Sequence, residues 1–342
     1  MSMMSAIRIR AAHERGRELF PGLLASAVVA AAAAFLSQHY GAPAMLFALL
    51  LGMAMNFLGS EGRCTAGIGF SARSVLRIGV ALLGLRITLS QVAAMGWQPL
   101  LLVVVSVTVT ISVSMVVARL FGFRGLFGLL TGGATAICGA SAALALAAAL
   151  PGHPLKERAT LFTVIGVSAL STIAMIAYPM IVHALGLNPV QAGIFLGGTI
   201  HDVAQVVGAG YSISRETGDA ATLVKLMRVA MLLPVIVFAV IVSRRAGKGE
   251  LVADGPRPPL LPGFAVAFAL LVLLNSTGWV PVAVQDFGND ASRWCLLTAM
   301  AAIGMKSQLR EVVTVGIKPV VLMILETVFL AGLVLGLMHW FS

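Results

Sequence analysis

Eleven apolar runs separated by short breaks make up most of this 342-residue chain. Each is close to the length of a helix that crosses a bilayer, which needs roughly 20 apolar residues. Only 11% of the residues are charged and 59% are hydrophobic, whereas about a quarter of a soluble domain is charged. No soluble core could bury this much apolar surface. The sequence therefore predicts an all-α polytopic membrane protein with about eleven transmembrane helices.

The breaks place the expected crossings at 20–37, 42–58, 73–90, 98–118, 126–150, 157–185, 190–212, 221–243, 260–277, 292–308 and 315–341. The first run is longer than the apolar region of a signal peptide, so we expect it to be retained. The chain then divides into a cytoplasmic tail (1–19), eight crossings (20–243), a cytoplasmic linker (244–259) and three further crossings (260–342).

Basic residues set the expected orientation, because Lys and Arg accumulate in cytoplasmic loops. With a cytoplasmic N-terminus, the inner loops hold Arg63, Arg73, Arg77, Arg119, Arg124, Arg244, Arg245, Lys248, Arg257, Arg310 and Lys318. Lys156, Arg158 and Arg215 would lie outside and weaken the pattern without reversing it. We expect a multi-pass protein of the bacterial inner (plasma) membrane.

Metal and cofactor chemistry have little support in the sequence. Cys64, Cys138 and Cys295 form no CxxC pair, and the six histidines are scattered, so neither a metal site nor a disulfide framework is expected. The chain also has no Walker A motif, which argues against ATP as its energy source. No cofactor is predicted.

An internal repeat relates Ala81–Val103 to Ala301–Met323 at an offset of 220 residues. Two glycines, a proline and a basic position stay in register, as the pairs Gly84 and Gly304, Gly96 and Gly316, Pro99 and Pro319, and Arg86 and Lys306. Asn56 and Asn275 extend the match upstream at an offset of 219. The copies are seven crossings apart, so they should run in opposite directions. Inverted repeats of this kind are typical of secondary transporters.

Two segments read as interrupted helices, Leu130–Ala143 and Leu196–Gly210. Both contain a Gly-Gly pair shortly before a polar cluster in an apolar surround. A break of this kind exposes backbone N–H groups and a helix N-terminus, which can hold an anion. The clusters are Thr135, Cys138, Gly139 and Ser141 in the first segment, and Thr199, His201, Asp202 and Gln205 in the second. Small-residue packing, or a structural pair that locks a break, would explain the same pattern.

Further charged residues fall within or near the apolar runs. Asp202 and His201 could bind a coupling proton, since a buried carboxylate is costly in a membrane and histidine titrates near neutrality. Glu326 lies in the middle of the last run and could pair with Lys306, take up a proton or stay protonated. Arg86 and Lys306 either reach the membrane interfaces or face an anion path. Lys225 and Arg228 are expected to anchor a helix end at the outer interface.

The stretches LRIGVALLGLRITLSQV (76–92), ICGASA (137–142), GGTIHDVAQVVGAG (197–210) and KLMRVAMLLPVI (225–236) resemble the YeiH-type membrane proteins, a family associated with sulfate export. Family members more often have Asn after the Cys-Gly pair, where this chain has Ala140. The resemblance implies a transporter fold similar to the bile-acid-symporter and cation/proton-antiporter group, with a core of broken helices. It raises the expectation of an anion substrate.

Together these features predict a secondary active transporter of a small anion, for example sulfate, a sulfonate or a carboxylate, coupled to protons or sodium. The candidate substrate-binding residues are Thr135, Cys138, Gly139, Ser141, Thr199, Gln205, Arg86 and Lys306, and the candidate ion-coupling residues are His201, Asp202 and Glu326. A passive anion channel is the alternative. An intramembrane enzyme with Ser141 as nucleophile and His201 as base has little support. The expected partners are the anion and the lipid bilayer, without nucleic acid, and a homodimer is an open option.

Overall fold

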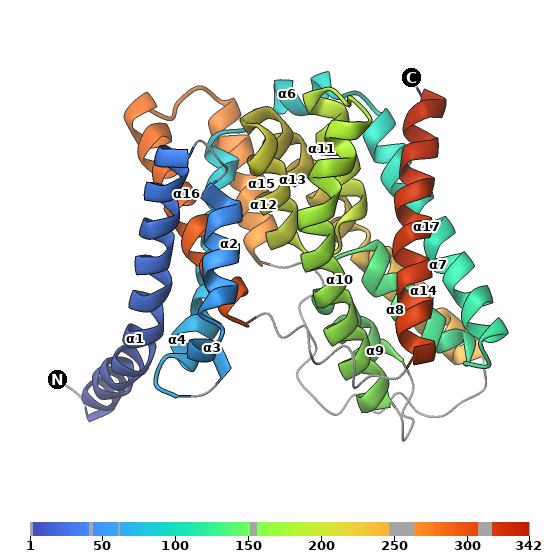
Figure 1. Ribbon diagram of the computed structural model, residues 1–342, viewed down its shortest axis with the longest axis horizontal. Helices are drawn as coiled ribbons and strands as arrows, with labels where there is room; N and C mark the ends of the chain where they lie inside the picture. The colour runs from blue at the N-terminus through green and yellow to red at the C-terminus, as the bar shows by residue number, and fades with distance from the viewer. Residues whose placement is uncertain are drawn as a thin grey trace. The chain divides into compact units, whose positions relative to one another are not determined.

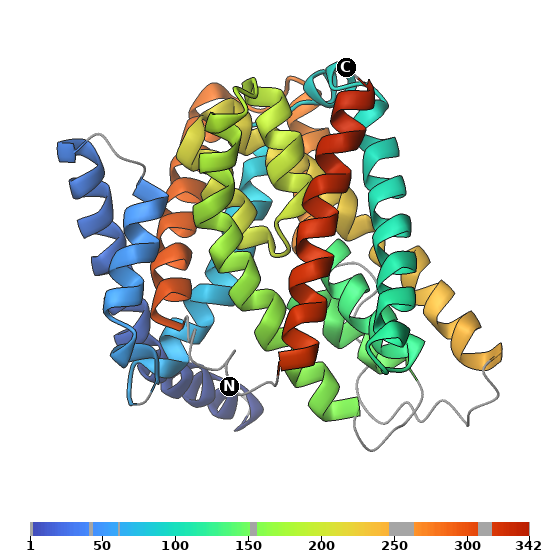
Figure 2. The same cartoon turned by 45° about the vertical axis from the view of Figure 1, so that its right-hand side comes forward.

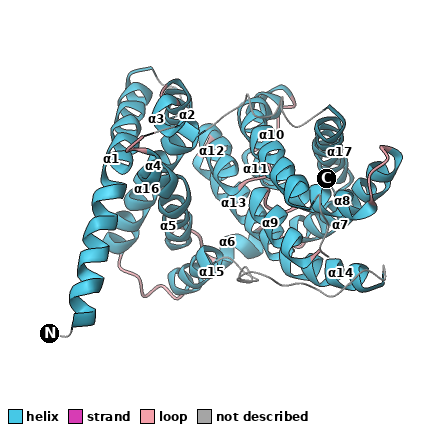
Figure 3. Ribbon diagram, turned by 90° about the horizontal axis from the view of Figure 1, so that it is seen from below, coloured by secondary structure: helices cyan, strands magenta, loops and turns pink. Residues whose placement is uncertain are grey.

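The computed structural model describes residues 3–40, 44–60, 62–150, 156–245, 263–306 and 317–341. These residues form helices joined by short turns, and no β-strand occurs among them (Figures 1 and 3). The chain divides into two compact units. Unit 1 comprises Met1–Thr88 and Ala267–Ser307, and unit 2 comprises Leu89–Val266 and Gln308–Ser342.

Unit 1 contains the N-terminal helices and a returning pair from near the C-terminus. Its elements are α1 (Met3–Tyr40), α2 (Ala44–Ala54), α3 (Phe57–Ser60), α4 (Thr65–Phe70), the π-helix η1 (Ser71–Val75), α5 (Leu76–Leu82), the 3-10 helix η2 (Leu83–Leu85), most of α15 (Gly263–Ser276) and α16 (Val282–Lys306). Helix α1 begins inside the segment 1–19 that was expected to be a tail, so it is longer than the predicted apolar run.

Unit 2 contains the central helices and the last one. Its elements are α6 (Leu89–Ala94), α7 (Gln98–Leu120), α8 (Gly125–Ala136), α9 (Ala140–Ala149), α10 (Lys156–Ala184), α11 (Pro189–Thr199), α12 (Val203–Ile213), α13 (Arg215–Ala230), α14 (Leu232–Arg245) and α17 (Ile317–Phe341). Most of the predicted linker 244–259 lies outside the described residues.

Six of the described helical stretches are long and apolar enough to cross a bilayer. They are Gly16–Tyr40, Thr65–Leu85, Gln98–Leu120, Arg158–Ala184, Arg215–Val242 and Ile317–Trp340. Shorter apolar helices fill several of the other predicted runs, including α2, α8, α9, α12 and α15. The all-helical prediction is therefore confirmed for the described residues.

The predicted repeat is visible in the contacts of unit 1. A Cβ added to Gly84 would collide with the carbonyl oxygen of Phe268, and one added to Gly304 would collide with that of Leu49. Phe268 follows Leu49 by 219 residues, nearly the offset that relates the two glycines. Each copy therefore places its glycine against the same backbone position of the other copy.

The repeat-related helices also run in opposite directions. Within unit 1, Gly79 lies against Leu296 while Gly288 lies against Leu85, so α5 with η2 is antiparallel to α16. Within unit 2, α17 lies beside α7 (Figures 1 and 2). The α7 residue Ser114 contacts Glu326 near the middle of α17. Residues 307–316 of the second copy lie outside the described residues.

Helices α8 and α9 form a hairpin. The chain leaves α8 at Ala136 and enters α9 at Ala140 through Gly139, whose φ of +62° and ψ of −128° suit glycine. A Cβ on Gly133 would collide with the Leu146 side chain, although in one continuous helix these residues would lie about 20 Å apart along the axis. The two halves therefore fold back on each other.

Helices α11 and α12 form a second hairpin. Gly193 of α11 and Gly210 of α12 both lie against Ala221 of α13, whereas a continuous helix would separate them by about 25 Å. The turn covers 200–202, between Thr199 and Val203. Both interruptions thus occur where the sequence predicted them, but each run is a pair of antiparallel half-helices rather than one interrupted crossing.

Candidate functional site

The tips of the two hairpins meet inside unit 2. A Cβ placed on Gly139 would lie 3.6 Å from the His201 carbonyl oxygen and 3.8 Å from the Asp202 Cβ atom. In Figure 1, α9 lies toward the lower edge and α11 toward the upper edge, so the hairpins approach from opposite ends. Ser171, near the middle of the 29-residue helix α10, accepts a hydrogen bond from the backbone N–H of Asp202 at 3.1 Å.

Arg228 of α13 joins the two tips. Its Nε donates to the Ala136 carbonyl at 2.8 Å and its Nη2 to the Thr135 carbonyl at 2.9 Å, both on the first hairpin. Its Nη1 donates to the carbonyls of Gly197 and Ile200 on the second hairpin, each at 3.0 Å. The side chain is fully buried. One guanidinium therefore crosslinks both hairpins through backbone oxygens.

Lys225, one turn earlier on α13, adds a second crosslink. Its Nζ donates to the Ile137 carbonyl at 2.7 Å, to the Ile200 carbonyl at 2.9 Å and to the His201 carbonyl. This ammonium is also fully buried. The expectation that Lys225 and Arg228 anchor a helix end at the outer interface is therefore wrong.

The two cations complement the helix dipoles at the tips. Helices α8 and α11 end there, and the carbonyls at a helix C-terminus carry partial negative charge. Helices α9 and α12 begin there, so their partly positive N-termini face the same region. Asp202 caps α12 by accepting from the N–H of Val203 at 2.7 Å. At the start of α9, Gly139 offers no side-chain cap.

His201 is fully buried and held at both ring nitrogens. Its Nδ1 lies 3.0 Å from the Thr135 carbonyl, and its Nε2 lies 3.0 Å from the Thr327 hydroxyl on α17. Because a carbonyl oxygen only accepts, Nδ1 carries the proton in this bond. The imidazole thus ties the second hairpin to both the first hairpin and α17.

Glu326 lies in a cage of hydroxyl groups from three chain positions. Thr131 donates to its Oε1 at 2.7 Å, Thr135 donates to its Oε2 at 3.2 Å, and Ser114 also bonds Oε1. Ser114 is 2.7 Å from the Gly128 carbonyl as well, so its single proton faces two acceptors. A proton on Glu326 would supply the missing donor. Thr135 links this carboxyl group to Arg228 and His201 through its backbone oxygen.

The other predicted tip residues differ in their surroundings. Thr199 is buried and donates to the Phe195 carbonyl of its own helix at 2.6 Å. Cys138 is a buried free thiol, whereas Ser141 is exposed. Gln205 is only 4% exposed, and its Oε1 atom has no hydrogen-bond partner. Of the predicted site residues, Arg86 and Lys306 belong to unit 1, whereas the hairpin tips belong to unit 2.

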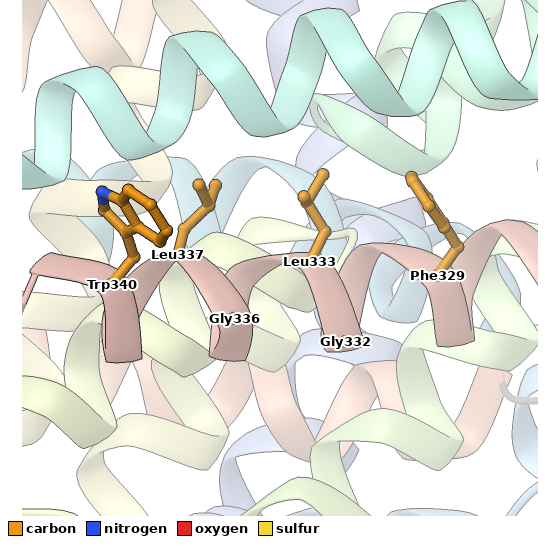
Figure 4. Close-up of a pocket in the computed structure, with 6 residues that line it drawn as sticks. All are labelled: Phe329, Gly332, Leu333, Gly336, Leu337 and Trp340. Atoms are coloured by element: carbon orange, nitrogen blue, oxygen red, sulfur yellow. The ribbon is translucent and has the colours of Figure 1, made fainter.

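A separate groove of about 470 Å³ runs along α17. It is lined by Phe329, Gly332, Leu333, Gly336, Leu337 and Trp340. Figure 4 shows the four side chains in a row on one side of the helix. Apart from the indole nitrogen of Trp340, the lining is apolar, so this groove is a poor place for an anion and a suitable one for hydrocarbon.

Long apolar helices around a buried polar junction define a polytopic helical membrane protein, in agreement with the description of its relatives as membrane proteins. The chain belongs to the family described as Conserved hypothetical protein 698, which matches residues 21–323. Its relatives carry the designation UPF0324. The predicted membership of the YeiH-type family is confirmed.

Several relatives match nearly the whole chain. A UPF0324 membrane protein of Chlorobaculum tepidum is 54% identical, covering 98% of this chain and 93% of its own length. The UPF0324 membrane protein TauZ of Paracoccus pantotrophus is 53% identical over 94% of this chain and 95% of its own length. One from Rhizobium meliloti is 53% identical over 94% of this chain and 92% of its own length. No solved structure matches significantly.

Proposed function

We propose that this protein is a secondary active transporter of a small anion that alternates access around the junction of the two hairpin tips. The observation that carries the proposal is the crosslinked pair of opposed hairpins, with Lys225 and Arg228 fully buried between them. Half-helices that end at mid-membrane build the substrate sites of many secondary transporters. Irregular backbone is tolerated at that depth only inside protein or beside a cavity.

The junction suits an anion better than a cation. Lys225 and Arg228 bring two positive charges to the tips, and the N-cap residue of α9, Gly139, has no side chain. Backbone N–H groups at a helix N-terminus bind anions readily. Sulfate, sulfonates and carboxylates are the candidate substrates, with Gly139 and Gln205 beside the proposed position.

The hairpins also change the proposed topology. We infer nine crossings and two re-entrant hairpins in place of eleven crossings, because both ends of a hairpin lie on one side. Lys156 and Arg158 then join Arg119 and Arg124 on the cytoplasmic side of the inner membrane, as the positive-inside rule favours. The N-terminus stays cytoplasmic. Of the three exceptions in the loop pattern, only Arg215 remains.

Proton coupling through Glu326 fits the site. The carboxyl group is buried among Ser114, Thr131 and Thr135, and a proton on it would let Ser114 accept from the carboxyl while donating to the Gly128 carbonyl. Gain or loss of that proton would act on Thr135, whose backbone oxygen holds Arg228 and His201. The proton site and the hairpin tips are thus directly connected.

A passive anion channel is the competing function. A buried polar junction would serve a channel as well, but a channel has no need for a proton site tied to the tips. Saturation, counterflow and uphill movement separate the two functions.

Purified protein in proteoliposomes provides the test. Labelled sulfate uptake is measured with and without an imposed pH gradient and competed by sulfonates and carboxylates. Saturable, gradient-driven uptake of any of these anions would support the proposal. Unsaturable flux that ignores the gradient would favour the channel, and no flux of any panel member from well-folded protein would overturn the anion proposal.

A second measurement separates a transport role of Asp202 from a structural one. Asp202→Asn keeps the acceptor that caps Val203 but removes the negative charge. If Asp202 takes part in coupling, gradient-driven flux falls while the melting temperature stays near that of the unaltered protein. A large fall in melting temperature would instead show that the negative charge of Asp202 stabilises the fold.

A further inference from the structure

We propose that Ser171 keeps the side-chain amide of Gln205 free to accept a hydrogen bond from the transported anion, which therefore carries a donor group of its own. This inference rests on the proposed anion transport and specifies the substrate: a short sulfonate or carboxylate with a hydroxyl group. It also makes Ser171 a positioning residue.

The start of α11 shows what a glutamine at this helix position ordinarily does. Asn188 caps the helix by accepting from the N–H of Gln191 at 2.9 Å. Gln191 returns the contact, because its Oε1 accepts from the N–H of Asn188 at 3.2 Å. Such a capping box satisfies two backbone donors at once. Gln191 is therefore fully used in holding its own helix.

The start of α12 has the same spacing but a different bonding pattern. Asp202 is the cap, and Gln205 stands three residues later, as Gln191 does after Asn188. The N–H of Asp202, however, donates to Ser171 on the neighbouring helix α10 at 3.1 Å. The Asp202 N–H is therefore not available to Gln205, and no capping box forms. The Oε1 atom of Gln205 has no hydrogen-bond partner.

This unpartnered oxygen is costly and needs a reason. Gln205 is 4% exposed, so water cannot readily replace the missing donor. Buried acceptors are normally bonded, and leaving one unbonded destabilises the fold. Within the part of the chain that is described, two other buried side-chain oxygens share this state, on Thr110 of α7 and Asn289 of α16. Neither is on a hairpin.

The position of Gln205 directs its amide to the junction. Side chains in a helix lean toward the N-terminus, and Gln205 is in the first turn of α12. That end of α12 lies against Gly139, the N-cap residue of α9. If the anionic group of a ligand binds at the start of α9, a hydroxyl group on the same ligand would lie near the Gln205 amide.

A thermal-unfolding experiment on the ligand-free full chain tests whether Ser171 frees Gln205. Gln205→Met should raise the melting temperature by about 2–4 °C, since it removes a buried unbonded acceptor. In a Ser171→Ala background the amide can close the capping box, so the same substitution should lower the melting temperature. The matched control Gln191→Met should lower it in both backgrounds.

The sign of the change in melting temperature caused by Gln205→Met decides the outcome of this experiment. A lower melting temperature with Ser171 present would mean that the amide already has a structural role, and would overturn the inference. If the Ser171→Ala protein does not fold, the test still rests on the opposite changes in melting temperature expected for Gln205→Met and Gln191→Met.

A ligand experiment tests the donor group. Binding is measured as thermal stabilisation by two matched pairs, ethanesulfonate against 2-hydroxyethanesulfonate and propionate against 3-hydroxypropionate. The hydroxylated member of at least one pair should act at about tenfold lower concentration, the value of one good hydrogen bond. Gln205→Met should abolish the preference and Ser171→Ala should weaken it. Absence of a preference in both pairs would overturn the inference.

Transport of the same compounds distinguishes this inference from the proposed function. A hydroxyl preference in binding, without gradient-driven flux of any anion, would reject the transporter and keep the Gln205 site. Gradient-driven flux without any hydroxyl preference would keep the transporter and reject the role of Gln205.

Discussion

Asn56 and Asn275 make reciprocal hydrogen bonds between the two copies of the repeat. Asn56 Nδ2 donates to the Met305 carbonyl at 2.9 Å, and Asn275 Nδ2 donates to the Ile87 carbonyl at 3.2 Å. Met305 and Ile87 each adjoin the basic residue of their copy, Lys306 or Arg86. Each copy therefore satisfies a backbone oxygen near the helix end of the other.

This reciprocity predicts matched losses of stability. Asn56→Ala and Asn275→Ala should each destabilise the protein by about 1–2 kcal/mol, because each leaves one backbone carbonyl without its donor. Thermal unfolding in detergent measures the effect. Ser60→Ala is the control, since that exposed hydroxyl bonds only within its own turn. A large loss at one asparagine and none at the other would contradict the symmetry.

The close helix contacts of unit 1 predict that its repeat glycines do not tolerate a methyl group. Gly304→Ala would push a Cβ into the Leu49 carbonyl, and Gly84→Ala would push one into the Phe268 carbonyl. Overpacking of this kind costs about 1–3 kcal/mol. Gly336→Ala on α17 meets nothing within 4 Å and should be neutral or stabilising by up to about 1 kcal/mol. Equal melting temperatures for all three variants would refute the packing argument.

Loss of Arg228 should be among the most damaging single changes in unit 2. Arg228→Met leaves four backbone carbonyls of two hairpins without this donor, and a buried acceptor left unbonded typically costs about 1–3 kcal/mol. Arg228→Lys keeps the charge but loses the planar fork, so it should be intermediate. Size-exclusion profiles and melting temperatures provide the measurement, with the exposed Arg158→Met as control. A monodisperse, fully stable Arg228→Met protein would rule out the crosslink.

Glu326→Gln should separate substrate movement from its driving force. The amide keeps the shape of the carboxyl and can still bond Ser114, Thr131 and Thr135, so we expect the fold to persist. It cannot gain or lose a proton, so acceleration by a pH gradient should fall by at least about tenfold, while exchange of labelled for unlabelled anion continues. Ser112→Ala, at an exposed hydroxyl of α7, is the control. Undiminished gradient response would remove Glu326 from the coupling mechanism.

The sequence predicted the positions of the chain breaks but not the direction of the chain after them. Gly-Gly pairs followed by polar residues marked the segments Leu130–Ala143 and Leu196–Gly210, and the helices are interrupted within them, at 137–139 and 200–202. However, a run of small apolar residues has the same sequence pattern in a straight helix and in a helical hairpin, because both forms bury similar faces. The contact of Gly133 with Leu146, which shows the fold-back, depends on tertiary packing.

The same limit explains why the role of α13 was missed. Counted as a straight crossing, the run from 221 places Lys225 and Arg228 near its outer start, where basic residues commonly meet lipid headgroups. Helix α13 begins earlier, at Arg215, and the hairpin tips lie beside its second half. Two basic residues one turn apart in an apolar run could have indicated a buried role. Their carbonyl partners could not be identified, because these are more than twenty residues away in sequence.

The Arg228 crosslink limits how the protein can move. Its guanidinium holds Thr135 and Ala136 on one hairpin and Gly197 and Ile200 on the other. If a gate opened by separation of the two tips, the buried Arg228 guanidinium would lose carbonyl acceptors without water to replace them. The helices from α8 to α13 should therefore move as one rigid body. Access to the junction would then change when this whole body is displaced, and not when the two hairpins separate.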